Sequence, residues 1–404
     1  MSKPPSCFVV GHPRRHHLYQ TALAYLEAGA LARWVTEVYV GGGPVAAALR
    51  LAARYTGSAK KLCNYSFPHL DEHVLVAQPD LLRRNVFRLL GSSTSDSNWE
   101  DSVVAESNRA QAGVHLPCVH AERVFERLHG CGRPLVLEQY IADRRQGRDV
   151  LLREADALGV RDRAALDGLG FAADRIAMNE AEYSLAHTIL AGSEFVRSSL
   201  LKHGVVPSKV VVAEYGVDLE RWAYRERRRH DSEPLEVAFI GSGALRKGLL
   251  RLLRAARIAG RVRVHVFGNV SDLPGGFSSW EQIAVFHGHL PQADLIRELG
   301  RCHAFALPSL WEGSALVVGE AMASGLPVVV SPNAGSWARN GLDGFVVPVG
   351  DEIALAEALR SLFEDPRRVE MGRNARRNAE LHTWQSYRRT VRTSNLGTSV
   401  NRAS

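Results

Sequence analysis

The sequence contains few cysteines, and they are widely spaced. Five occur in 404 residues, and no two of them stand in C-x-x-C spacing. An odd number of scattered cysteines excludes a disulfide framework, and the missing C-x-x-C pair excludes a zinc ribbon. Thiols distributed in this way are typical of a reducing compartment, so we expect a cytoplasmic protein.

Long hydrophobic runs are also missing. No stretch approaches the roughly 18 consecutive apolar residues that a membrane-spanning helix needs. The apolar run nearest the start, Cys7–Val10, is closed by His12 and Pro13 and is too short for a signal-peptide core. We therefore expect no membrane span, which leaves peripheral contact with the inner membrane face as the open possibility.

The excess of positive charge does not indicate a nucleic-acid partner. The formal net charge is +7, and the densest basic run is RWAYRERRRH, residues 221–230. Its aromatic residues, Trp222 and Tyr224, stand only at its start and do not alternate with the basic residues that follow, as they would in a base-stacking platform, and no nucleic-acid motif surrounds it. Two interpretations stay open: a solvated linker, or a surface that meets anionic lipid or a phosphorylated substrate. No D-x-D metal-ligand motif occurs, so we expect neither a catalytic metal nor another cofactor.

Short apolar runs alternate with helical periodicity, which indicates an α/β protein with parallel sheets. The strands expected in the first half are Cys7–Val10, Val114–Leu116, Leu135–Leu137, Ile189–Ala191 and Val210–Val212. Those expected in the second half are Leu235–Ile240, Val262–Phe267, Ile283–His287, Ala304–Leu307, Pro327–Val330 and Gly344–Val347. The pattern predicts two doubly wound, Rossmann-like domains facing each other across a cleft.

The basic stretch 221–234 ends at Pro234 and marks the boundary between the two halves. We place the domains at residues 1–225 and 226–378. Residues 379–404 are expected to form a helix that returns to the first domain, followed by a frayed tail. Gly91–Asn98 is interpreted as an exposed loop because it consists almost entirely of small polar residues.

The segment FIGSGALRKGLLRLL, residues 239–253, has the features of an anion site. A strand ends at Ile240, Gly241 and Gly243 permit close backbone approach, and Arg246 and Lys247 stand at the start of a helix. The glycines leave backbone N–H groups accessible, and a helix N-terminus lies beside two cations. Both features favour binding of a phosphate group. The alternative is a tight turn with a solvated Arg-Lys pair, because G-x-G is common by chance.

The second candidate segment is LPSLWEGSALVVGEAMASGLPVVVS, residues 307–331. Glu312 precedes a helix that contains Glu320 and ends at Gly325. Both carboxylates can address one cleft, together with the N–H groups of the three residues that open the helix, Ser314, Ala315 and Leu316. Carboxylates are good acceptors for vicinal hydroxyls, so the pattern suits a ligand with sugar hydroxyls on either side of a pyrophosphate. The alternative is a helix start with one dipole-complementing acid and one surface glutamate.

These segments, together with AGSEFVRSSLLKHG and EYGVDLERW, resemble the signature segments of glycosyltransferase family four. Members of that family are retaining, nucleotide-sugar-dependent transferases with the GT-B fold. The resemblance extends over about residues 185–365 and is weaker over the first 180. It implies an acceptor-side domain in residues 1–225 and a donor-binding domain in residues 226–378.

The resemblance also implies roles for individual residues. Glu312 corresponds to the glutamate that contacts the donor sugar, and Glu320 corresponds to the one that binds the nucleotide ribose. Arg246 and Lys247 correspond to the pair that holds the diphosphate. The remaining donor-binding positions implied are Gly243, Gly313, Ser314, Ala315, Leu316 and, in the loop that lines the base, Leu290.

Two departures and one open position accompany the resemblance. Ser242 stands where the family usually has an arginine on the pyrophosphate, and Tyr215 stands where it usually has asparagine. A histidine of the first domain often lies near the donor sugar in this family. Its candidates here are His12, His115 and His120, and we place His120 in the catalytic set beside Glu312 and Lys247.

The resulting expectation is a retaining hexosyltransferase whose partners are a nucleotide-diphosphate sugar and an acceptor. Glycan, lipid-linked, phosphorylated and small-molecule acceptors all remain open. Because no carboxylate nucleophile stands out, we expect front-face, metal-independent substitution with the leaving phosphate as proton acceptor. The alternatives are a non-catalytic nucleotide-sugar-binding protein, a nucleotide-sugar epimerase or a glycan phosphorylase of the same fold.

Overall fold

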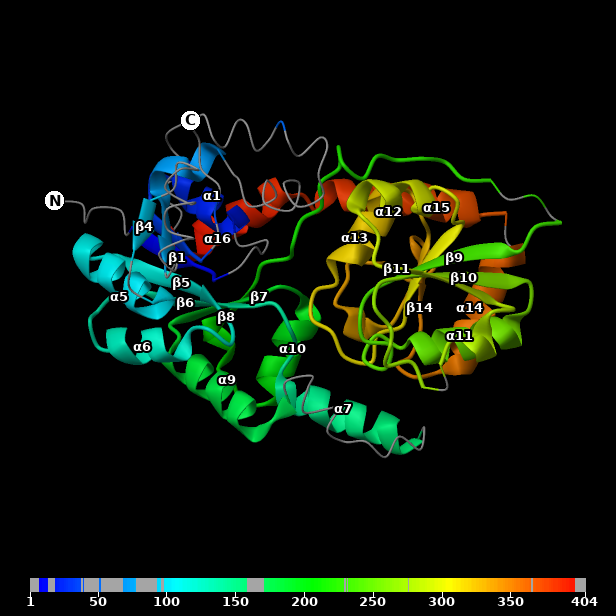
Figure 1. Cartoon of the computed structure of the whole chain (residues 1–404), viewed down its shortest axis with the longest axis horizontal. Helices are drawn as coiled ribbons and strands as arrows, with labels where there is room; N and C mark the ends of the chain where they lie inside the picture. Colours follow the sequence, from blue (N-terminus) through cyan, green and yellow to red (C-terminus); the bar gives the residue numbers. More distant parts are fainter. Residues whose placement is uncertain are drawn as a thin grey trace.

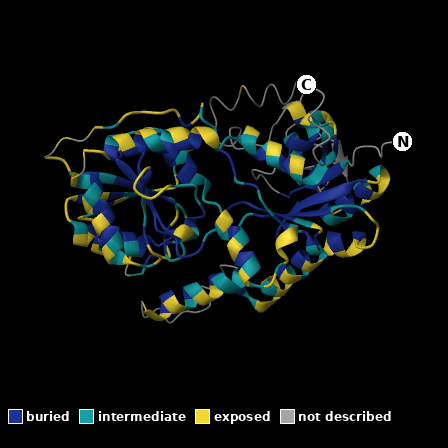
Figure 2. Cartoon of the chain, turned by 180° about the vertical axis from the view of Figure 1, so that it is seen from behind, coloured by how far each residue is buried: buried dark blue, intermediate teal, exposed yellow. Residues whose placement is uncertain are grey.

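The computed structural model describes residues 7–13, 19–37, 39, 51, 68–77, 93–95, 98–157, 171–228, 230, 232–274, 276–364 and 366–396. Within them, two parallel sheets with flanking helices form two halves that lie side by side (Figure 1). The strands are buried inside each half, and exposed residues gather on the outer faces of the helices (Figure 2). The prediction of two doubly wound α/β sheets is confirmed.

The first sheet is parallel throughout, and its strand order reverses beside β1. Its order is β4(Ser93–Ser95)-β3(Val74–Ala77)-β2(Leu31–Thr36)-β1(Phe8–Gly11)-β5(Gly113–Pro117)-β6(Leu135–Gln139)-β7(Thr188–Ala191)-β8(Val210–Val212). The helices of this half are α1(Tyr19–Glu27), α5(Trp99–Ala110), α6(Glu122–Leu128), α7(Arg144–Ala157), α9(Ala173–Leu185) and α10(Glu194–Lys202). The order rises on both sides of the β1–β5 pair, so the carboxyl ends of these two strands form the topological switch point, where doubly wound sheets bind ligands.

The second sheet repeats this design. Its order is β11(Ala284–Gly288)-β10(Val262–Phe267)-β9(Leu235–Ile240)-β12(Ala304–Leu307)-β13(Val328–Val330)-β14(Gly344–Val346). The flanking helices are α11(Leu249–Ala259), α12(Gln292–Leu299), α13(Leu316–Ala323), α14(Glu352–Glu364) and α15(Arg368–Leu381). Short 3-10 helices lie at η1(Pro68–His73), η3(Pro207–Lys209), η4(Ser278–Trp280) and η5(Pro332–Ala334). The switch point lies between β9 and β12, whose following loops carry the two candidate segments.

The edge of the first sheet differs from the sequence-based expectation. Ser93–Ser95, predicted to lie in an exposed loop, forms β4 and pairs with β3, with Leu75 opposite Ser93. An edge strand needs backbone pairing on one side only, so three polar residues can occupy it without an apolar pattern. The flanking residues 91–92 and 96–97 lie outside the described residues. The sequence analysis also missed β2, where Arg33 interrupts the apolar pattern and pairs with Glu106 at 3.3 Å.

Two segments connect the halves, and they pair with each other. The first follows β8, and the second joins α15 to the last described helix, α16(Trp384–Leu396). Val217 and Thr383 form a parallel bridge, and the Val217 N–H donates to the carbonyl of His382 at 3.0 Å. A Cβ on Gly216 would lie 2.1 Å from the backbone nitrogen of Trp384, so this close pairing requires glycine. The domain limits at residues 225 and 378 stay a prediction.

Helix α16 packs against α1 of the first half, although it follows the whole second half in sequence (Figure 1). Its anchor is Tyr387, whose hydroxyl donates to the carboxylate of Glu138 at 2.7 and 2.9 Å. Glu138 lies in β6 and is 1% exposed. Its Oε2 also lies 2.9 Å from Nε2 of His115, and Nδ1 of that ring contacts the Tyr25 hydroxyl at 3.0 Å. A buried carboxylate must be hydrogen-bonded, and here part of that requirement is met by the far end of the chain.

We expect Tyr387→Phe to lower the free energy of unfolding by about 1–3 kcal/mol, because it keeps the ring but removes a donor from a buried carboxylate. Urea unfolding followed by circular dichroism measures the change. Arg389→Ala is the control, since Arg389 is an exposed residue of the same helix. Equal stability of the Tyr387→Phe variant and the wild type would contradict the anchoring role.

Candidate functional site

The first candidate segment places two cations at the carboxyl end of β9. Backbone geometry explains its glycines: a Cβ on Gly241 would lie 2.3 Å from Cδ of Lys247, and one on Gly248 would lie 2.2 Å from the carbonyl oxygen of Pro308. Gly243 and Gly248 also have positive φ angles, 84° and 72°. The loop therefore folds the lysine stem over the strand end. Helix α11 begins only at Leu249, so Arg246 and Lys247 precede the helix rather than standing in its first turn.

Both cations contact the same carboxylate oxygen of Glu312. Arg246 Nη1 lies 2.6 Å and Lys247 Nζ lies 2.8 Å from Oε2 of Glu312. We call these three residues the ion triad. Burial acts to raise the pKa of Glu312, but the neighbouring Lys247 and Arg246 outweigh it and lower that pKa. The sequence predicts all three residues for one site, and the structure brings them together. In the structure, the Glu312 carboxylate forms ion pairs with both cations.

The loop that carries Glu312 is held by the first half of the chain. Gly313 forms an antiparallel bridge with Ile141, and the Ala142 N–H donates to the carbonyl of Glu312 at 3.1 Å. The Ser193 hydroxyl donates to the carbonyl of Gly313 at 2.6 Å. A Cβ on Gly313 would lie 2.1 Å from the carbonyl oxygen of Tyr140, so only glycine permits this approach.

Trp311, the neighbour of Glu312, fills the space between the halves. It is 1% exposed, its ring lies 4.8 Å from that of Phe171, and its Nε1 donates to the carbonyl of Asp143 at 3.3 Å. The ring also leaves no room for a side chain at Gly147, whose Cβ would lie 2.5 Å from it. The sequence analysis missed this role, although a tryptophan directly beside a candidate glutamate is a signal for it.

The residues after Gly313 differ from the expectation that three N–H groups point into an open site. Helix α13 begins at Leu316, and the Ala315 N–H donates to the carbonyl of Ala334 at 3.1 Å, so the prediction is wrong for Ala315. Ser314, Ala315 and Leu316 instead line a cavity of about 10 Å³ that Gly192 and Tyr215 close from the first half. That volume is at the lower limit for a single water molecule.

Glu320 occupies a different environment from Glu312. It lies in the middle of α13 and receives a hydrogen bond from Trp222 in the first connecting segment. Burial raises the pKa of Glu320 to about 7, and Arg221 and the Trp222 hydrogen bond only partly oppose this rise. Leu290, the candidate for lining the nucleotide base, follows β11 at the edge of the second sheet. It is partly buried and packs against the apolar core of the second half. The structure thus spreads the predicted donor residues along the carboxyl edge of the second sheet.

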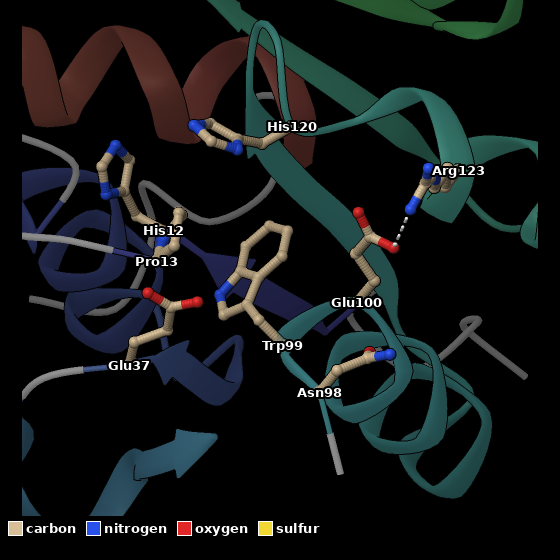
Figure 3. A pocket seen from close by; sticks show the side chains of 8 residues that line it. All are labelled: His12, Pro13, Glu37, Asn98, Trp99, Glu100, His120 and Arg123. Carbon is tan, nitrogen blue, oxygen red and sulfur yellow. Dashed lines mark ion pairs between the residues drawn. The ribbon is translucent and has the colours of Figure 1, made fainter. Parts of the chain in front are cut away.

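The structure places the three histidine candidates in two different environments. His115 is fully buried in the Glu138 network described above, so it is a core residue and cannot reach a ligand. His12 and His120 lie together, with ring centroids 6.0 Å apart, at the switch point between β1 and β5. Both line a cavity of about 520 Å³ (Figure 3). His120 therefore remains a candidate, and His12 joins it.

The sequence analysis missed the other walls of this cavity. The lining residues besides the two histidines are Pro13, Glu37, Asn98, Trp99, Glu100 and Arg123. Trp99 is fixed by a hydrogen bond from its Nε1 to the carbonyl of Val35 at 3.0 Å. Arg123 and Glu100 form an ion pair at 3.5 Å across the rim (Figure 3). Aromatic and acidic side chains around a concave space suit a polyhydroxylated ligand.

The basic run 221–230 makes contacts within the chain. Arg227 Nη1 donates to the carbonyl of Ser324 at 2.5 Å, and Glu226 pairs with Arg228 at 3.1 Å and with Arg373 at 2.6 Å. These contacts favour the linker interpretation for the described part of the run. Among the described residues, no helix combines the length and apolarity needed to cross a membrane, and no cluster of three or more His, Cys, Asp or Glu side chains is arranged to hold a metal ion.

Comparison with known proteins gives a family match in the second half. Residues 220–379 match the family model described as glycosyl transferases group 1. The chain is 29% identical over 170 residues to glycogen synthase of Mycobacterium tuberculosis (strain ATCC 25618 / H37Rv), covering 39% of the chain and 41% of that protein. It is 30% identical over 226 residues to D-inositol 3-phosphate glycosyltransferase of Mycobacterium bovis (strain BCG / Pasteur 1173P2), covering 48% and 47%. The matched part thus spans less than half the length of these relatives.

A solved structure extends the likeness to the whole fold. The crystal structure of Anabaena Alr3699/HepE in complex with UDP-glucose superposes with a TM-score of 0.59 at 14% sequence identity, covering 96% of the chain and 99% of that protein. At this identity the likeness establishes the fold alone. The predicted GT-B fold is confirmed.

We expect Glu320→Gln to remove part of the pH dependence of stability. The pKa of Glu320 is raised from 4.5 to about 7 in the native state. Between those values the native state holds a proton that the unfolded state has lost, so the free energy of unfolding falls as pH rises through this window, by about 3 kcal/mol. Urea unfolding of both proteins at about pH 5 and about pH 8 measures the difference. An identical change with pH in the two proteins would show that Glu320 titrates normally.

Proposed function

We propose that the protein is a retaining hexosyltransferase, on the premise that residues 220–379 match the family model of group 1 glycosyl transferases and that the chain has the GT-B fold. It transfers a hexose from a nucleotide-diphosphate sugar to an acceptor that binds in the first half. The observation that carries the proposal is the ion triad: two cations and a carboxylate gathered on the loops after β9 and β12.

When the donor binds, the two cations of the ion triad exchange the Glu312 carboxylate for the diphosphate. A diphosphate carries more negative charge than one carboxylate and replaces Glu312 on Arg246 and Lys247. Glu312 is then available to accept hydrogen bonds from the hydroxyls of the donor sugar. Glu320 serves the ribose in the same way, and because only the ionised form accepts two hydroxyls, its raised pKa links nucleotide affinity to pH.

The transfer step needs positioning and charge stabilisation. The bond between the anomeric carbon and the phosphate oxygen breaks, and the acceptor oxygen bonds to the same face of that carbon, so the configuration is retained. The acceptor proton moves to the departing phosphate oxygen, and Arg246 and Lys247 stabilise the charge that develops there. His120 contacts the donor sugar from the first half, and the acceptor occupies the cavity shared by His12 and Trp99.

A second candidate function is nucleotide-sugar binding without transfer. Ser242 favours it, since the family usually places a phosphate-binding arginine at this position. Two features support transfer instead. Arg246 and Lys247 supply two cations at the same strand end, and the first half provides a cavity large enough for a second substrate. A nucleotide-sugar epimerase of the same fold would consume donor without any acceptor.

A thermal-shift screen tests the donor class. We expect a uridine, guanosine or adenosine diphosphate, or one of their hexose conjugates, to raise the melting temperature by several degrees, because a ligand that binds only the native state stabilises it. UDP and UDP-glucose come first, since HepE, which shares the fold, was crystallised in complex with UDP-glucose. No shift with any nucleotide at millimolar concentration would refute the proposed donor site. Donor consumption without acceptor would favour the epimerase.

Substitutions in the triad should separate binding from turnover. We expect Lys247→Met to weaken nucleotide diphosphate binding and to lower turnover by about 10²-fold or more, because a developing phosphate charge loses one cation. Glu312→Gln should lower turnover comparably while nucleotide diphosphate binds at least as tightly, because the two cations no longer have a competing partner. Calorimetry and product release measure the two effects. Arg254→Ala, a half-buried cation on α11 that pairs with Glu352 outside the ion triad, is the control, and losses of similar size in all three variants would argue against the site.

A further inference from the structure

The loop that presents His120 contains a strained residue. Val119, which follows β5 and Cys118, has a φ of 68°. This left-handed conformation costs a β-branched residue about 1–2 kcal/mol and persists only where the surroundings enforce it. Because Val119 directly precedes His120, the strained conformation sets the direction in which the imidazole leaves the backbone.

A single buried carboxylate binds the backbone on both sides of His120. Glu182, in α9, is completely buried. Its Oε2 accepts the N–H of Val119 at 3.0 Å, and its Oε1 accepts the N–H of Ala121 at 2.9 Å. The side chain of Asn179 donates to Oε2 at 2.7 Å and fixes the carboxylate in place.

Glu182 also performs the task of a missing helix cap. Helix α6 begins after Ala121, which has no side chain that could accept a hydrogen bond from the first turn. The carboxylate of Glu182, which belongs to α9, accepts hydrogen bonds from backbone N–H groups at the start of α6. A negative charge at a helix N-terminus is favourable. Burial nevertheless raises the pKa of Glu182, and the backbone hydrogen bonds only partly offset this rise. Keeping the Glu182 carboxylate ionised at this buried position therefore costs free energy.

We propose that Glu182 is a positioning residue that holds His120 toward the His12–Trp99 cavity by enforcing the left-handed conformation of Val119. The inference rests on the proposed function, since it assigns a purpose to the orientation of His120. A carboxylate is the matching group, because both of its oxygens accept hydrogen bonds. A glutamine would present an NH2 group to one of the two N–H donors, and the loop would relax toward an extended Val119 that turns His120 away.

The test follows the His120 imidazole directly by NMR of the full chain labelled with [13C]histidine, with the signal assigned by its loss in His120→Gln. We expect Glu182→Gln to shift or split the His120 signal. Val119→Gly added to Glu182→Gln should restore a single signal near the wild-type position, because glycine adopts a positive φ without strain. Val124→Ala is the matched control: it removes a fully buried side chain from α6 and leaves the carboxylate contacts intact.

An unchanged His120 signal in Glu182→Gln would overturn the proposal. A Val124→Ala variant that perturbs the signal equally would also overturn it, because helix stability alone would then explain the effect. If Glu182→Gln does not fold, Asn179→Ala loosens the same carboxylate and is judged by the same two outcomes.

Turnover separates this inference from the proposed function. With UDP-glucose, or the donor that the thermal screen identifies, we expect Glu182→Gln to lower kcat by on the order of 10²-fold at nearly unchanged KM, and Val119→Gly to recover part of the loss. A displaced His120 signal together with unchanged kcat would support the positioning by Glu182 and refute the catalytic role of His120.

Discussion

The buried carboxylate of Glu138 is the constraint on which the joining of the two halves depends. It lies in the middle of the first sheet, where an unpaired charge would be strongly destabilising, and one of its donors comes from α16, the last helix that the structure describes. Because α16 must return to satisfy it, the second connecting segment lies beside the first, and the two pair at Val217 and Thr383. The relative placement of the sheets therefore depends on a polar contact as well as on apolar packing.

Three carboxylates, two of them fully buried and Glu312 partly buried, serve different purposes because their donors differ. Glu138 accepts hydrogen bonds from the neutral Tyr387 hydroxyl and contacts the His115 imidazole, and it ties distant parts of the chain together. Glu182 is bound by backbone N–H groups, and it fixes the shape of one loop. Glu312 is bound by two cationic side chains, which a ligand can displace. Only the last arrangement can change partners without unfolding the backbone around it, which is why it suits a substrate site.

The sequence predicts the strands well where they are fully buried and poorly at the edge of the first sheet. Buried parallel strands such as β12 are continuous apolar runs, whereas β2 carries Arg33 and β4 consists of serine and threonine. The triad residues could be found from glycine spacing and acid placement. Their mutual pairing could not, because it requires two loops separated by more than sixty residues to meet. Glu182 gives no local signal for its role, since the backbone N–H groups that it binds lie at the start of another helix.

Trp311 gives the arrangement an optical consequence. Its indole belongs to the loop of the second half but lies in a cluster with Ala142, Leu151 and Phe171 of the first half. Any motion that separates the halves at this point carries the indole from an apolar environment into water. Its contribution to the fluorescence of the seven tryptophans is therefore a built-in reporter of opening, attached to the same loop as Glu312.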